Sequence, residues 1–214
     1  MNATRPASTR DRLLDAAERL YAEHGFTATS LRTLTEAAGA NVAAVNYHFG
    51  SKEGLLRAVV ERAMASVNAE RLRLLEELRT SGHQPTVEEL VRAFVATGAS
   101  IIERGGERGQ AVSRFLGRVM FEPDPAIRRL FGTQVAPVEG QYLDALRAAL
   151  PGLSPEEVAF RYRAMVGLLG LHQSGTLGDL HPGRPAEAAP GTDTETGHLI
   201  ALLTAGLQAP PAAR

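Results

Sequence analysis

One short segment holds the strongest structural signals in the chain. Ser30 is placed to cap a first helix over 31–38, because its hydroxyl can accept from backbone N–H groups that lack a helical partner. Gly39 follows, and glycine adopts at little cost the positive φ with which helices commonly end. Asn41 can then cap a second helix over 42–48. Two short helices joined by so tight a turn have helix-turn-helix spacing.

The residues of this unit fit DNA recognition. The second helix of such a unit is free to enter a DNA major groove. Its alanines allow close approach to bases, and its aromatic and amide side chains can contact phosphates or base edges. Lys52, the only lysine in the chain, follows the capping Ser51 and adds a cation at a helix N-terminus, where phosphate is attracted. The predicted DNA-binding residues are Ser30, Arg32, Thr33, Asn41, Ala43, Ala44, Asn46, Tyr47, His48 and Lys52.

Several motifs occur around this unit in a recognisable order. They are Gly25-Phe26 after an amphipathic helix, Thr29-Ser30-Leu31-Arg32, Ala37-Ala38-Gly39 and Tyr47-His48-Phe49-Gly50-Ser51-Lys52-Glu53. Over roughly residues 9–60 the chain therefore resembles the TetR family of bacterial transcriptional repressors. It differs over 42–46, where many members carry a glycine and a threonine before an aromatic, and this difference bears on the operator sequence.

Composition sets the outer limits. The chain has 214 residues, of which 44% are hydrophobic and 22% charged, as in ordinary globular proteins. It lacks cysteine, which excludes disulfides and thiolate metal sites. No apolar run is long enough to span a membrane and no signal-peptide core is present, so we expect a cytoplasmic protein without a membrane partner. Neither a metal nor a cofactor is expected.

The charge balance limits how DNA can be bound. The formal net charge is −1, and residues 1–80 carry 11 basic and 10 acidic residues. Affinity for phosphate must therefore come from locally placed cations and not from a bulk basic field.

The rest of the chain predicts helices only, so the expected fold class is all-α. Apolar residues recur at helical spacing, and helix starts are marked by capping pairs such as Thr86 with Glu89 and Ser154-Pro155 with Glu157. The expected helices cover 9–24, 51–80, 86–104, 110–121, 126–150, 158–175 and 196–207. The expected domains are a helix-turn-helix DNA-binding domain (1–51), a helical regulatory and dimerisation domain (52–208) and a disordered tail (209–214).

Several local features carry expectations of their own. The Gly105-Gly106 pair should break one helix and Pro137 should kink or break another. Gly167 and Gly170 should let a second helix approach closely. The glycine- and proline-rich segment 176–191 is expected to be a loop. Charged residues of the long helix, among them Arg71, are expected to form a solvated face.

The resemblance implies what the larger domain does. In the family, the last two long helices pair with their copies in a four-helix bundle, which implies a homodimer through 156–175 and 195–207. The middle helices enclose a small-molecule pocket. Ordinary core packing is the alternative interpretation for each candidate lining residue. The candidates are Met64, Phe94, Phe115, Met120, Phe121, Phe131, Met165 and His172.

A finer resemblance concerns the effector. The run Arg114-Phe115-Leu116-Gly117, the segment 165–175 and the recognition segment are similar to the branch of the family that contains fatty-acid-responsive repressors. This implies an apolar effector such as a fatty acid or its thioester. The function expected is therefore a ligand-responsive repressor that binds double-stranded operator DNA.

Two other classes of function are alternatives, namely an enzyme and a protein-binding scaffold. An enzyme would need a converging catalytic set, but the sequence contains no HExxH or GxSxG motif and no cysteine nucleophile. A helical scaffold that binds protein instead of DNA is the alternative from a different class. A band-shift titration across salt separates this scaffold from a specific DNA reader.

Overall fold

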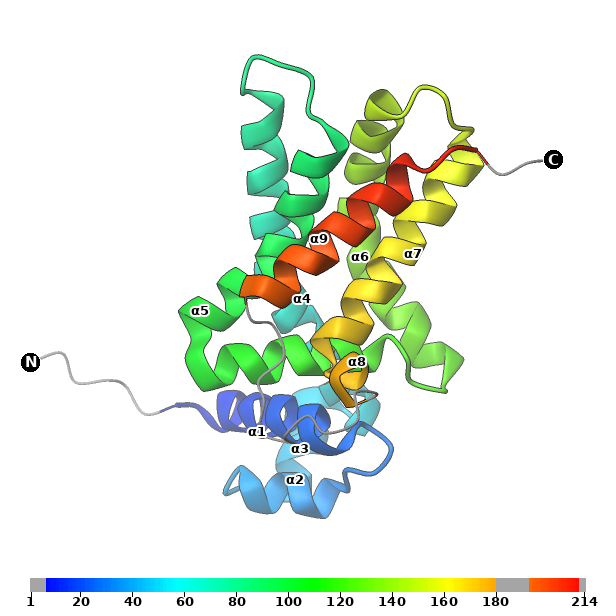
Figure 1. Ribbon diagram of the computed structural model, residues 1–214. Helices are drawn as coiled ribbons and strands as arrows, with labels where there is room; N and C mark the ends of the chain where they lie inside the picture. Colours follow the sequence, from blue (N-terminus) through cyan, green and yellow to red (C-terminus); the bar gives the residue numbers. More distant parts are fainter. Residues whose placement is uncertain (1–6, 180–192, 212–214) are drawn as a thin grey trace, which may run out of the picture.

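Helices make up all the regular secondary structure of the part of the chain described by the computed structural model, residues 7–179 and 193–211 (Figure 1). The all-α prediction is confirmed. The helices are α1 (Thr9–His24), α2 (Leu31–Ala37), α3 (Val42–Phe49), α4 (Lys52–Arg79), α5 (Val87–Val119), α6 (Pro125–Ala149), α7 (Pro155–Gln173), α8 (Thr176–Asp179) and α9 (Asp193–Gln208).

The first three helices form one end of the molecule, and each begins at a residue that caps it (Figure 1). Ser30 accepts from the backbone of Thr33, and Asn41 accepts from that of Ala44 at 2.9 Å. Gly39, between them, has φ 58°. The helix-turn-helix segment thus folds as its residues predict, with α2 ending one residue earlier and α3 one residue later than expected.

A buried cluster joins this end of the molecule to the rest. Leu13 and Leu34 lie at its centre together with Val45, and each of the three is 0% exposed. The same cluster includes Phe115 of α5 and Ile127 of α6. A second cluster fills the far end between α4, α5, α6, α7 and α9. The end formed by α1, α2 and α3 is called the DNA-binding end after its predicted role. It therefore shares a hydrophobic core with the larger body.

Helix α5 bends at Gly106. This glycine has φ 55° and ψ −132°, outside helical values, and the helix resumes directly after it. The expected break at the glycine pair is present, although no separate loop forms. Because of the bend, residues 107–119 cross over α1, as Figure 1 shows.

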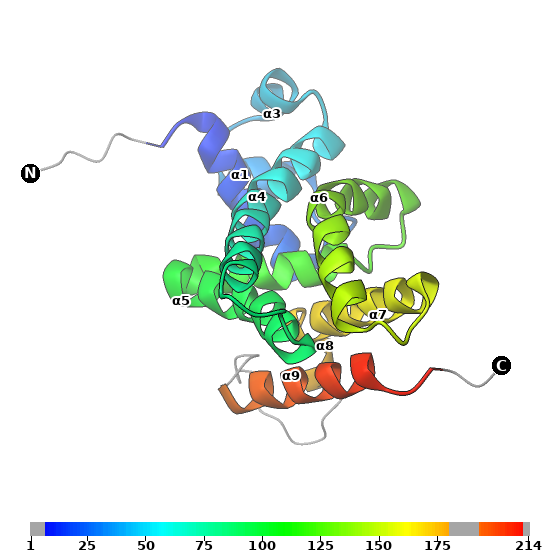
Figure 2. The ribbon, with the colours of Figure 1, turned by 90° about the horizontal axis from the view of Figure 1, so that it is seen from above.

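Pro137 lies inside α6 without ending it. A proline cannot donate to the preceding turn, which leaves the carbonyl four residues earlier, that of Thr133, without its helical donor. The amide of Asn68 on α4 donates to the next carbonyl, that of Gln134, at 2.7 Å. Of the predicted kink or break, the break is therefore absent, because α6 continues through Pro137, whereas Figure 2 shows the helix changing direction along its length.

Other expectations need correction. Segment 176–191 was predicted to be a loop, but its first four residues form α8, and residues 180–191 lie outside the described part. Helix α9 begins at Asp193 instead of 196. Residues 212–214 of the predicted disordered tail also lie outside the described part.

Helix α9 runs along one side of the body beside α7 and α5 (Figure 2). The guanidinium of Arg161 on α7 holds its end, donating to the carbonyls of Leu207 at 2.7 Å and Pro210 at 2.8 Å. These carbonyls have no helical partner, so Arg161 caps the C-terminus of α9. None of the described helices is long and apolar enough to cross a membrane.

Candidate DNA interface and effector cavity

One flank of α3 is exposed and the other is buried. Val45 faces the core with no exposed surface, whereas Tyr47 is 84% exposed. Ala43 and Asn46 lie on the exposed flank with Tyr47. Val42 is 43% exposed and belongs to this flank too. The second helix of the helix-turn-helix therefore presents a continuous outer surface of small, amide and aromatic side chains.

The start of α2, the helix that precedes α3 in the chain, is also exposed. The hydroxyls of Ser30 and Thr33 are hydrogen-bonded to each other at 2.8 Å. Arg32 donates to Glu36 one turn later at 2.8 Å. An exposed pair of this kind adds little stability, so the guanidinium can exchange its partner for a phosphate at small cost.

The side chain of Lys52 packs against the loop between α1 and α2. Its ammonium donates to the Phe26 carbonyl at 2.8 Å and lies 4.2 Å from the centre of the Phe26 ring. Burial lowers the pKa of Lys52, and Glu53 and Glu122 oppose this effect. The phosphate contact expected of Lys52 stays a prediction, and in the free protein its half-buried side chain holds the loop between α1 and α2.

Other cations lie closer to the exposed flank. The guanidinium of Arg10 lies 5.5 Å from the centre of the Phe49 ring at the end of α3. Arg12 instead donates to the Ala38 carbonyl at 3.0 Å and so caps α2. Of these two, Arg10 is the one whose charge remains available.

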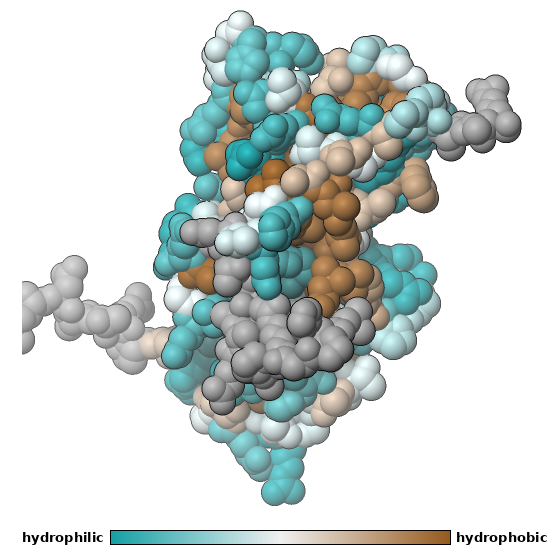
Figure 3. Space-filling view, in the orientation of Figure 1, coloured by the Kyte–Doolittle hydropathy of each residue, from teal (hydrophilic) through white to brown (hydrophobic). Residues whose placement is uncertain are grey.

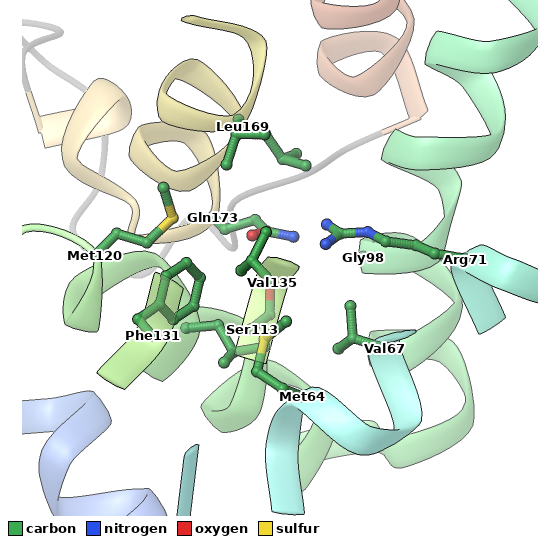
Figure 4. A pocket seen from close by; sticks show the side chains of 12 residues that line it. Met64, Val67, Arg71, Gly98, Ser113, Met120, Phe131, Val135, Leu169 and Gln173 are labelled. Atoms are coloured by element: carbon green, nitrogen blue, oxygen red, sulfur yellow. The ribbon is translucent and has the colours of Figure 1, made fainter. Parts of the chain in front are cut away.

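A small cavity lies between α4, α5, α6 and α7 (Figure 4). Its volume is about 20 Å³, enough for a single water. Its lining is mostly apolar and includes the polar side chains of Arg71, Ser113 and Gln173. The lining residues are Met64, Val67, Arg71, Gly98, Ser113, Leu116, Met120, Phe131, Val135, Val166, Leu169 and Gln173.

Three of the predicted effector residues line this cavity, namely Met64, Met120 and Phe131. The other predicted residues lie elsewhere. Phe94 packs on Tyr142 and Tyr162 in the far core, and Phe115 stacks on Tyr21. Phe121 is 49% exposed, and Met165 borders a surface groove on α7 and α9. His172, on the last turn of α7, is not among the residues that line the cavity.

Arg71 is the lining residue that the sequence did not reveal. It was expected on a solvated face, but it is 7% exposed and its guanidinium lies 3.8 Å from the centre of the Phe94 ring. Its position in the helix contained the signal. Arg71 continues the buried stripe of Val67 and Leu75 at a spacing of four residues, so it lies on the inner side of α4.

The second half of α5 lies close to the end of α7. A Cβ on Gly117 would lie 2.5 Å from the backbone nitrogen of Ser174, and one on Gly170 would lie 2.7 Å from the sulfur of Met120. The predicted close approach is therefore present at Gly170. At Gly167 a Cβ would meet nothing within 4 Å, so this glycine does not serve that contact.

The second half of α5 connects the cavity to the DNA-binding end. Ser113 and Leu116 line the cavity, while Phe115 between them contacts Tyr21 of α1 with ring centroids 6.3 Å apart. Just beyond the helix, a carboxylate oxygen of Glu122 accepts from the Phe26 backbone at 3.0 Å. A movement of this half of α5 would therefore reach α1 directly.

Two models of protein families match the chain. Residues 13–59 match the one described as bacterial regulatory proteins, tetR family. Residues 92–206, more than half of the chain, match the one described as tetracyclin repressor-like, C-terminal domain. The chain belongs to the TetR family. Regulators of this family bind operator DNA, dimerise and bind small-molecule effectors, and the matching families and relatives are regulators, not enzymes.

Individual TetR-family relatives agree mainly over the DNA-binding end. The chain is 49% identical over 53 residues to the HTH-type transcriptional repressor ComR of Escherichia coli, covering 25% of each protein. It is 38% identical over 61 residues to the repressor AcnR of Corynebacterium glutamicum, covering 28% of this chain and 32% of AcnR. The match thus spans a third or less of these relatives.

Solved TetR-family structures agree over the whole fold. The fatty acid degradation regulator FadR from Bacillus halodurans superimposes with a TM-score of 0.68, at 15% identity, over 96% of this chain and 99% of that one. At this identity the likeness shows the fold alone.

Proposed function

We propose that this TetR-family chain is a transcriptional repressor that an apolar effector releases from operator DNA. The observation that carries the proposal is the exposed flank of α3, which the buried Val45 holds in place at the tip of the molecule. A helix presented in this way can enter a major groove without any rearrangement of the domain.

The DNA contacts follow from this placement. Ala43 and Asn46 would face base edges, and Tyr47 would contact a phosphate or base from its exposed position. Ser30 and Thr33 would donate to the phosphate backbone from the start of α2, joined there by Arg32. Asn41, Ala44 and His48 border the same surface. Lys52 supports the site from inside the fold instead of contacting DNA.

Repression at a two-fold operator needs two copies of α3, and the α7–α9 face supplies a dimer surface. Phe160 and Leu202 on this face are 66% and 61% exposed. They border a groove of about 810 Å³ whose walls include Met165, Leu168 and Leu207. Figure 3 shows apolar residues gathered beside these two helices. We propose that 156–175 and 195–207 pack against their copies there, because exposed apolar residues that gather on one face commonly mark an interaction site.

The effector would bind in the cavity between α4 and α7. Its volume of about 20 Å³ is far below that of a drug-sized ligand, so binding requires the surrounding helices to separate. The ligand would then favour a conformation in which the 107–119 half of α5 is displaced. Because that segment contacts α1, the shift would alter the position of the two DNA-binding ends.

A fatty acid or an acyl thioester is the effector class that we propose. The apolar wall of Met64, Met120 and Phe131 suits an alkyl chain. The shared fold with a fatty acid degradation regulator is consistent with it.

Selection of bound fragments from random DNA tests the DNA part of the proposal. The expected result is one enriched palindromic site, competed by itself and not by random DNA, with affinity that falls as salt rises. Failure to enrich any site would overturn it. Band shifts on the recovered site with fatty acids and their thioesters then test release.

A further inference from the structure

Arg71 is a buried cation to which no described residue supplies a counter-charge. Its guanidinium points across the cavity toward the side chain of Gln173 (Figure 4). Within the described residues, no hydrogen bond or ion pair joins its side chain to another group, and Nε is buried without a partner. An unpaired buried charge is costly to a fold. A ligand of opposite charge would remove this cost.

Its protein neighbours do not supply that charge. The Cζ atom of the guanidinium lies 3.8 Å from the centre of the Phe94 ring, a cation–π contact that supplies no negative charge. The Tyr142 hydroxyl donates to the backbone carbonyl of Arg71 at 3.4 Å, not to its side chain. Burial lowers the pKa of Arg71 to about 10, an effect opposed by Tyr162 and Tyr142. Arg71 is therefore still charged at neutral pH.

The rest of the lining includes both polar and apolar side chains. Gln173 and Ser113 are its other polar residues. A Cβ on Gly98 would lie 2.5 Å from the Gln173 amide nitrogen, so the glycine leaves room for that amide beside the guanidinium. Met120 and Phe131 lie across the cavity from Arg71 (Figure 4), and Met64 adds to the apolar lining. A molecule that fits such a lining has a compact polar head and an apolar body.

We propose that the effector is a monocarboxylic acid whose carboxylate pairs with Arg71 and whose apolar body lies against Met64, Met120 and Phe131. The inference rests on the proposed function and narrows it to the free acid. One carboxylate balances one guanidinium and matches its two-pronged geometry. A phosphate dianion would leave one negative charge over. A thioester carbonyl would leave the guanidinium unneutralised.

Calorimetric titration of the full chain without DNA tests this inference directly. The probes are hexanoate, decanoate and benzoate, each with its neutral primary amide as the matched compound. At least one acid should bind about tenfold or more tightly than its amide, the size expected for a charge-assisted hydrogen bond. If no acid binds, or if acids and amides bind equally, the inference is overturned.

Variants of Arg71 test whether the preference for the acid over its amide depends on this side chain. Arg71→Met should bind acid and amide equally, whereas Arg71→Lys should keep a weaker preference for the acid. Arg73→Met is the control, because Arg73 lies on the same helix but is exposed and paired with Glu70. It should keep the full preference. An acid preference that survives in Arg71→Met also overturns the inference, and the lysine variant keeps the test valid if the methionine variant does not fold.

A separate band-shift arm distinguishes the two proposals. An acid that binds through Arg71 but leaves the protein on its operator contradicts the release mechanism only. Release by acid and amide at equal concentrations contradicts the role of Arg71 and leaves the repressor function standing.

Discussion

The guanidinium of Arg108 on α5 lies against the carboxylate of Glu18 on α1, with 3.2 Å between Nε and Oε1. The Glu18 side chain is only 3% exposed, and its other oxygen lies 2.7 Å from the guanidinium of Arg62 on α4. One buried carboxylate thus joins three helices. These are the first helix of the DNA-binding end, the long helix, and the helix whose second half borders the cavity.

Glu18→Gln should therefore destabilise the whole molecule. The substitution leaves Arg62 and Arg108 without their shared buried charge, and we expect the free energy of unfolding to fall by about 1–3 kcal/mol. Arg108→Met is the control. Because Arg108 is 58% exposed and Glu18 keeps Arg62, it should cost less than about 1 kcal/mol. Urea unfolding followed by circular dichroism measures both, and equal losses would contradict the assignment.

Lys52→Met tests whether this lysine acts inside the fold or on DNA. Its ammonium donates to the Phe26 carbonyl, so we expect a loss of about 1–2 kcal/mol in unfolding free energy. The slope of log operator affinity against log salt should stay unchanged, because no phosphate contact is lost. Arg10→Met should instead lower that slope by about one. A lower slope for Lys52→Met would instead show that Lys52 contacts a DNA phosphate directly, as the sequence alone suggested.

The helix caps and the bend of α5 can be predicted from the sequence. Ser30, Asn41 and Ser51 cap the helices that follow them, since a capping hydroxyl or amide acts on backbone only three residues away. Gly106 bends α5 for an equally local reason. The helix-turn-helix could be predicted because its signals are short-range and occur in order.

Long-range partners could not be predicted in the same way. A charged residue in a long helix usually faces solvent. The spacing of Arg71 from Val67 and Leu75 places it on the apolar stripe, but the packing of α4 against α5 and α6 is what buries that stripe. Likewise, nothing near Lys52 in the sequence points to the Phe26 carbonyl, which lies 26 residues earlier. The candidate effector residues Phe94 and Phe115 fit helical spacing equally well for core or cavity, and tertiary packing alone separates the two.

Ala43→Glu should abolish operator binding while leaving the fold intact. Ala43 is exposed on the outer flank of α3, so the longer side chain meets solvent in the free protein. Against DNA it brings a negative charge to the groove, and we expect affinity to fall by about 100-fold or more. Ala65→Glu, exposed in the middle of α4, is the control and should bind normally. Fluorescence anisotropy on the selected site measures affinity. Normal binding by Ala43→Glu would exclude α3 as the reading helix.

Phe160→Glu combined with Leu202→Glu should produce a monomer. Both side chains are mostly exposed on the α7–α9 face, so the charges cost the isolated chain little but would be buried at a dimer interface. Operator affinity should fall with dimerisation, because half-sites would then be bound singly. Ala148→Glu, exposed near the end of α6, is the control. Sedimentation velocity gives the mass, and a double variant that remains dimeric would place the interface elsewhere.

The close contact between α5 and the end of α7 can be tested with a single methyl group. In Gly117→Ala the new Cβ would lie 2.5 Å from the Ser174 nitrogen and 2.6 Å from the Gly170 oxygen. Backbone atoms cannot move aside as a flexible side chain does, so the helices must separate. We expect a loss of about 1–3 kcal/mol in unfolding free energy.

Gly140→Ala is the opposite case on α6. Its Cβ would meet nothing within 4 Å, and alanine favours a helix over glycine by about 1 kcal/mol, so this variant should gain stability. Thermal and urea unfolding of the pair give the sign of each change. A gain in both variants would mean that α5 and α7 do not approach closely at Gly117.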